Sequence, residues 1–156
     1  MSEKSMLEKL QGYYSVELYS EIEYKRFADK TDNVYAKSLY TKLAEDERRH
    51  QGILKDIAAF YHPDWRDILV EVKPSTPIQP EKLTITSEVQ EAYHAMKFHL
   101  KLEFLAVTEY RKTAQETREP KLRDLWLNLA SDEERHHREI NSLLQAFEKA
   151  YKEIIK

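Results

Sequence analysis

The sequence predicts an all-α protein built from four long helices. Only two of its 156 residues are glycine and five are proline, so turns are few. Charged residues make up 34% of the chain and hydrophobic residues 41%, a balance typical of long amphipathic helices. Apolar side chains recur three and four residues apart in four separate stretches, which is the helical period. Because this length usually makes one domain, we expect a single domain over residues 1–156.

The first two predicted helices cover residues of about 6–29 and 34–61. Ser5 and Glu8 have the spacing of a capping box at the start of the first helix. Asn33 ends a polar triplet that can cap the second helix. A connection this short predicts two antiparallel neighbours.

Residues 62–87 form the one long connection of the predicted fold. Prolines break a long helix, and four of the five in the chain lie here. Helices joined by a short, a long and a short connection indicate a bundle with one crossover between the second and third helices. The four prolines are Pro63, Pro74, Pro77 and Pro80.

The third and fourth predicted helices cover residues of about 88–117 and 120–150. Ser87 and Gln90 have the spacing of a second capping box. Pro120 suits the first turn of the last helix, where its missing N–H has no intrahelical partner to lose.

The chain repeats itself at an offset of 86 residues. This shift aligns Glu17 with Glu103 and Tyr24 with Tyr110. One shift that aligns both helix pairs without a gap predicts two related helical hairpins. It also sets Asp46, Glu47, Arg49 and His50 on Asp132, Glu133, Arg135 and His136.

Six polar residues stand where the helical stripes require apolar ones. A buried ion costs several kcal/mol unless it is neutralised. Two divalent metal ions would balance four ionised glutamates, with the histidines binding as neutral imidazoles. A glutamate from each of two helices and a Glu-x-x-His pair from each of the other two is the ligand set of dinuclear carboxylate bundles, with metals expected about 3.5–4 Å apart. The six predicted ligands are Glu17, Glu47, His50, Glu103, Glu133 and His136.

The identity of the metal stays open at this point. Oxygen and imidazole ligands favour iron or manganese, as a matched or a mixed pair, and also admit zinc or cobalt. Glu134 and His137 form a competing pair in the last helix. That pair continues to Asn141, off the apolar stripe, whereas His136 leads to Ile140, so we expect Glu133 and His136 to be the ligands.

On these motifs the sequence resembles the rubrerythrin branch of the ferritin-like superfamily over most of its length. The resemblance implies a ferritin-like bundle with two iron ions and an oxidoreductase that reduces hydrogen peroxide in oxidative-stress defence. It implies bridging roles for Glu47 and Glu133 and terminal roles for Glu17 and Glu103. The alternatives are a ferroxidase or iron-handling protein and an oxygen-activating di-iron oxidase.

Three further residues are candidates for contact with the ligands. The resemblance implies that Tyr24 and Tyr110 donate hydrogen bonds to the carboxylates. His99 lies one turn before Glu103 on the same face, as either a hydrogen-bond donor to the ligands or a core histidine.

Two roles are open for Glu21 beside the predicted centre. Rubrerythrins tend to carry an extra carboxylate one turn after the third-helix glutamate, where this chain has Ala106 and Val107. Glu21 lies one turn after Glu17, in the mirror position. It either tunes the metal bound by Glu17 or forms a surface ion pair with Lys25.

Charge and cysteine content restrict the partners. The absence of cysteine excludes thiolate metal sites and hence a cysteine-ligated rubredoxin domain, so the resemblance implies an external electron donor such as a rubredoxin-type protein. A net charge of −3 argues against nucleic acid. We expect no membrane partner and a cytoplasmic location, because no membrane-length apolar run or signal-peptide core is present. We expect a homodimer, since the segment after Phe147 is too short for the fifth helix of ferritin cages.

Overall fold

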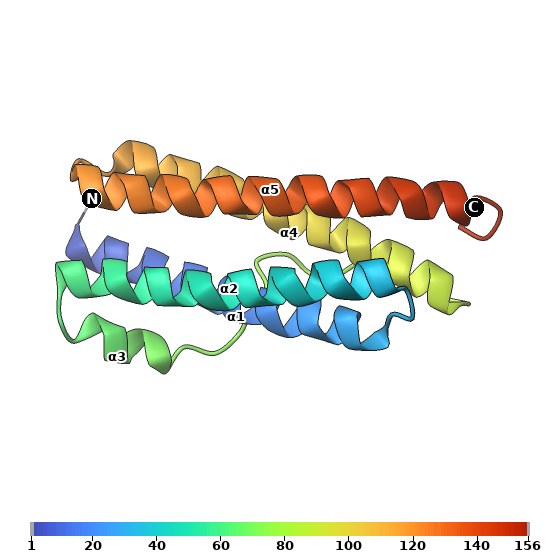
Figure 1. The fold of residues 1–156 in the computed structure, drawn as a ribbon. Helices are drawn as coiled ribbons and strands as arrows, with labels where there is room; N and C mark the ends of the chain where they lie inside the picture. The colour runs from blue at the N-terminus through green and yellow to red at the C-terminus, as the bar shows by residue number, and fades with distance from the viewer. Residues whose placement is uncertain (1, 156) are drawn as a thin grey trace. The chain divides into compact units, whose positions relative to one another are not determined.

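The computed structural model describes residues 2–155, which form five helices and no strand (Figure 1). Contacts divide the described chain into two compact units. The first contains residues up to Pro77 together with Glu116–Leu125, and the second contains Ile78–Gln115 and the residues from Trp126 onward. The expectation of one domain stays a prediction. No helix within residues 2–155 is apolar enough over a sufficient length to cross a membrane.

The first unit is built on a hairpin of α1 (Glu3–Lys30) and α2 (Val34–Tyr61). The two helices pack side by side and run antiparallel, as Figure 1 shows. The ring of Tyr24 meets that of Tyr40 edge to face, with centroids 5.5 Å apart. Apolar side chains spaced at the helical period fill the space between the helices. The large side chains that are fully buried here include Leu10, Tyr24, Tyr40, Leu43, Leu54 and Ile57.

The two helix starts of the first hairpin differ in how well the sequence predicts them. The N–H of Ala36 donates to the side-chain oxygen of Asn33 at 2.9 Å, so the expected cap of α2 is confirmed. The expected capping box of α1 is wrong, because Ser2 and not Ser5 is its N-cap. The hydroxyl of Ser2 accepts from the N–H of Ser5 at 3.2 Å, on an extended backbone that suits a cap. The helix therefore begins at Glu3, before the expected residue 6.

The crossover contains a short helix that the sequence analysis did not predict, α3 (Trp65–Val70). Trp65 and Leu69 are spaced one turn apart and both are buried, and α3 packs on α1 and α2. Tyr61, at the end of α2, stacks on Trp65 with ring centroids 5.7 Å apart. Burial raises the pKa of the Tyr61 hydroxyl above its ordinary value.

The crossover contacts each hairpin through a residue at the same position of the 86-residue repeat. In the first unit, the buried hydroxyl of Ser15 lies 2.6 Å from the carbonyl oxygen of Lys73 and 2.6 Å from the hydroxyl of Ser75. In the second unit, the ammonium group of Lys101 lies 3.4 Å from a carboxylate oxygen of Glu81. Residues 15 and 101 are related by the offset of 86.

The second unit is built on most of α4 (Glu88–Glu116) and most of α5 (Pro120–Ala150). The hydroxyl of Ser87 accepts from the N–H of Gln90 at 3.1 Å, as the capping box predicts. The side chain of Gln90 differs from the predicted box, because it accepts from the N–H of Thr86 at 3.1 Å and not from that of Ser87. Pro120 is the first residue of α5, the position expected for it.

The helices of the second unit are antiparallel as well. Gln90, near the start of α4, donates to the carbonyl of Ile154 at 3.4 Å. Tyr110, near the end of α4, packs on Trp126, near the start of α5, with ring centroids 5.8 Å apart. This aromatic pair is the counterpart of Tyr24–Tyr40 at the offset of 86. Both hairpins therefore pair their helices in the same register.

Candidate metal centre

The first hairpin buries a triad of two carboxylates and one imidazole. Glu17 comes from α1, whereas Glu47 and His50 come from one face of α2. Each offers a potential ligand atom within 4.8 Å of those of the other two. The Nδ1 of His50 lies 3.5 Å from Oε2 of Glu17. All three residues are at most 1% exposed.

The second hairpin buries the equivalent triad. Glu103 comes from α4, and Glu133 and His136 come from one face of α5. Their potential ligand atoms also lie within 4.8 Å of one another. The Nδ1 of His136 lies 3.6 Å from Oε1 of Glu103 and 3.3 Å from Oε1 of Glu133. All three residues are at most 2% exposed.

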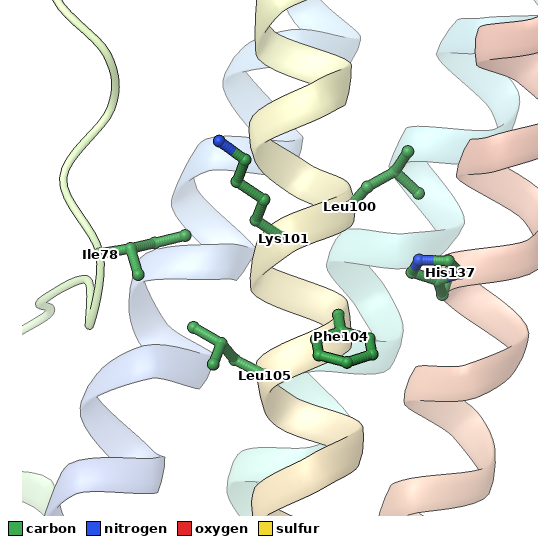
Figure 2. Close-up of a pocket in the computed structure, with 6 residues that line it drawn as sticks. All are labelled: Ile78, Leu100, Lys101, Phe104, Leu105 and His137. Atoms are coloured by element: carbon green, nitrogen blue, oxygen red, sulfur yellow. The ribbon is translucent and has the colours of Figure 1, made fainter.

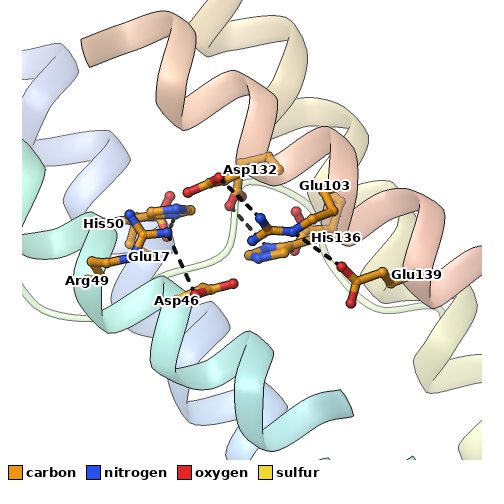
Figure 3. Close-up of polar contacts among 10 residues, drawn as sticks. Glu17, Asp46, Arg49, His50, Glu103, Asp132, His136 and Glu139 are labelled. Carbon is orange, nitrogen blue, oxygen red and sulfur yellow. Dashed lines mark ion pairs between the residues drawn. The ribbon is translucent and has the colours of Figure 1, made fainter.

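Charged residues at the rim of each triad form a second repeated pattern, shown in Figure 3. In α2 the guanidinium of Arg49 lies 3.7 Å from Asp46, and in α5 that of Arg135 lies 3.6 Å from Asp132. Arg135 also lies 3.3 Å from Glu139. Both arginine side chains are substantially exposed, 51% for Arg49 and 39% for Arg135, so solvent screens their charges.

The donor chemistry of each triad fits a divalent metal ion. Two ionised carboxylates carry two negative charges, which one divalent ion balances, while the imidazole binds in its neutral form. Without such an ion the buried charges are costly. Carboxylate and imidazole ligands together suit iron and manganese.

Glu21 makes a contact that the sequence analysis did not foresee. Its Oε1 accepts a hydrogen bond from Nε2 of Gln51 at 2.8 Å. Within residues 2–155 no ion pair joins Glu21 to Lys25, so the second of the two alternatives for Glu21 is not observed there. The signal for Gln51 in the sequence is weak: it directly follows His50, and its counterpart in the repeat is His137.

The remaining candidates near the triads are buried. His99 is 0% exposed on α4, one turn before Glu103. Tyr24 and Tyr110 pack in the two equivalent aromatic pairs described above. The hydrogen bonds expected from these tyrosines to the carboxylates, and the role of His99, stay predictions.

The competing pair of α5 lies in a different environment from the triad. The side chain of Glu134 is 44% exposed and forms ion pairs with Arg111 and with Arg138, the latter at 3.6 Å. His137 lines an open, mostly apolar pocket of about 410 Å³ in the second unit, shown in Figure 2. The other residues that line it are Ile78, Leu100, Lys101, Phe104 and Leu105.

An all-helical chain with buried carboxylate and imidazole triads has the features of the ferritin-like carboxylate proteins. The chain belongs to the rubrerythrin family, whose model matches residues 8–144. This confirms the predicted fold class, a ferritin-like helical bundle, and implies a non-haem di-iron protein.

One solved structure similar to the chain is that of a hypothetical protein from Pyrococcus furiosus. The two are 25% identical, with a TM-score of 0.75 over 90% of this chain and 89% of the other. No curated protein matches the chain. The fold is thus shared with a protein whose name states no activity.

Proposed function

We propose that the two triads together hold a dinuclear iron centre that reduces hydrogen peroxide. The observation that carries the proposal is the repeated burial of two glutamates and one histidine in each hairpin. Membership of the rubrerythrin family supports iron as the metal. The proposed ligands are Glu17, Glu47, His50, Glu103, Glu133 and His136.

The proposed ligand roles are supported by charge balance and by the family resemblance. Four carboxylates carry four negative charges, so the set is neutral when it holds two ferrous ions. The family resemblance assigns bridging roles to Glu47 and Glu133 and terminal roles to Glu17 and Glu103. His50 and His136 would complete the two positions as neutral imidazoles, the form in which histidine binds a metal ion.

When bound, two ferrous ions would supply two electrons, which with two protons would convert one molecule of hydrogen peroxide into two molecules of water. The protein's contribution is to hold its ligands in a dry environment. Residues that are at most 2% exposed exclude bulk solvent and admit a small oxidant more readily than a bulky substrate.

The electrons for a further turnover come from another protein in this proposal. The chain has no cysteine and hence no thiolate-bound iron of its own. We propose an external donor of the rubredoxin type, acting on a cytoplasmic homodimer.

The test is to compare two oxidants on the same reduced protein. Iron-loaded protein, reduced under anaerobic conditions, is mixed with equal concentrations of hydrogen peroxide or oxygen, and the absorbance of ferric iron is followed. We expect peroxide to oxidise the protein at least about tenfold faster, a difference of about 1.4 kcal/mol in activation free energy. Faster oxidation by oxygen would contradict a peroxidase and favour a ferroxidase or an oxidase.

A matched variant connects the reaction to the triads. His50→Ala removes an imidazole from the first triad, and we expect it to lose the rapid reaction with peroxide. His62→Ala is the control, because His62 lies in the crossover with its side chain 52% exposed. Rapid oxidation that survives in His50→Ala would separate the reaction from this site.

A further inference from the structure

The charged residues around the two triads differ, and Glu21 is one of these differences. Glu21 follows Glu17 by one turn of α1, whereas the residue at the same place in α4 is the buried Val107. Gln51 follows His50 in α2, and its counterpart in α5 is His137. The first hairpin therefore has a carboxylate and an amide where the second has an aliphatic group and an imidazole.

The amide of Gln51 connects the two ligand-bearing helices at this point. Its Nε2 lies 2.8 Å from Oε1 of Glu21 and 3.5 Å from the carbonyl oxygen of Glu17. Gln51 is only 7% exposed, so its donor group needs a protein acceptor. A hydrogen bond to an ionised carboxylate is stronger than one between neutral groups, so it fixes the position of Glu21.

The placement of Glu21 gives its charge an effect on the first triad. Four residues of helix place Glu21 about 6 Å along the axis from Glu17. Glu21 is half-buried, whereas the cations that line the same surface pocket, Lys25 and Arg48, are exposed. Water screens exposed charges more strongly than half-buried ones, so the negative charge of Glu21 is screened less than the positive charges of these two cations.

We propose that Glu21, held by Gln51, is a supporting carboxylate that gives the first triad a higher affinity for divalent cations than the second. Glu21 acts through its charge and is not itself a ligand. The inference rests on the proposed function, in which both triads bind metal. A divalent cation supplied in limiting amount then fills the first triad before the second.

The test is a titration of the metal-free protein with Co²⁺, whose visible spectrum reports its ligands. The unmodified chain should bind two ions with unequal affinities. Glu21→Gln removes the charge and keeps an oxygen that accepts from Gln51, so its fold and stoichiometry should be unchanged. We expect the tighter affinity to fall by about tenfold, toward the weaker one.

Two further variants separate charge from structure. Gln51→Met removes the donor and should weaken the tighter affinity in the same direction by a smaller factor. A purely structural role of Gln51 would lower the melting temperature of the metal-free protein and leave both affinities unchanged. Glu8→Gln is the matched control, because Glu8 is an exposed carboxylate near the start of α1.

The possible failures are distinguishable. Two Co²⁺ ions bound with equal affinity, or with affinities that Glu21→Gln does not change, would overturn this inference and leave the proposed metal centre standing. Loss of one whole equivalent in Glu21→Gln would also overturn it, because Glu21 would then be a ligand. An unmodified chain that binds no Co²⁺ would overturn both proposals.

Discussion

The hairpins α1–α2 and α4–α5 present the same three candidate ligand residues in the same register, but their surroundings differ. The histidine lies 3.5 Å from the glutamate of the facing helix in the first hairpin and 3.6 Å in the second. An aromatic pair occupies the same two positions in each. The Glu21–Gln51 hydrogen bond, in contrast, is formed in the first hairpin alone, since the second has Val107 and His137 in these places.

This contrast separates what the candidate centre requires from what each hairpin can vary. Buried carboxylates are costly unless a cation balances them. Two buried carboxylates in each hairpin therefore indicate that both hairpins have the same chemical requirement. The residues around each triad do not have to balance this charge, so they can differ between the two hairpins. The attachment of the crossover varies in the same way, through the buried Ser15 in one hairpin and the exposed Lys101 in the other.

The largest expected effect comes from removing one histidine from either triad. Both His50→Ala and His136→Ala leave two carboxylates without an imidazole, so each should reduce the iron content from about two ions to about one per chain. Iron analysis of protein shown to be folded by circular dichroism measures this. A variant that retains its full iron content would break the equivalence of the two triads.

An intermediate effect is expected from the two aromatic pairs. Tyr40 and Trp126 are both 0% exposed, so truncating either to alanine should cost about 3–5 kcal/mol of unfolding free energy through lost burial and the cavity left behind. Urea unfolding of the metal-free protein measures the loss. Tyr35→Ala is the control, because Tyr35 is 70% exposed and its loss should change stability by less than about 0.5 kcal/mol. A loss as small as the control's at either buried position would show that the pairs are not equivalent.

The smallest effects concern the two attachments of the crossover. Ser15→Ala removes a buried hydroxyl from the carbonyl of Lys73 and should cost about 1 kcal/mol. Lys101→Ala removes an ion pair with Glu81 whose side chains are 58% and 66% exposed, and should cost less than about 0.5 kcal/mol. The same urea titrations compare them. The reverse order would contradict the view that burial decides which attachment is stronger.

Helical periodicity was sufficient to predict the long helices, because each has an apolar stripe over many turns. It gave the bounds of α2 and α5 as the structure has them. It missed the start of α1, since the first turn after Ser2 is polar and lies outside the stripe. It also missed α3, whose six residues are too few to show a period.

The candidate ligands could be predicted because they repeat and because charged residues are rare on an apolar stripe. Gln51 could not, since an amide on a helix is compatible with either a surface or a core position. Only the packing of α1 on α2 shows that its donor group reaches Glu21. A contact between helices depends on their rotation about their own axes, which the spacing within one helix does not determine.

The central claim is that the two triads each hold one metal ion, and the iron content of the unmodified chain tests it most directly. The protein is loaded with ferrous iron under anaerobic conditions, freed of unbound metal, and analysed for iron per chain. We predict about two iron ions per chain, as in other dinuclear carboxylate bundles. A content of one ion or none in fully folded protein would contradict the account.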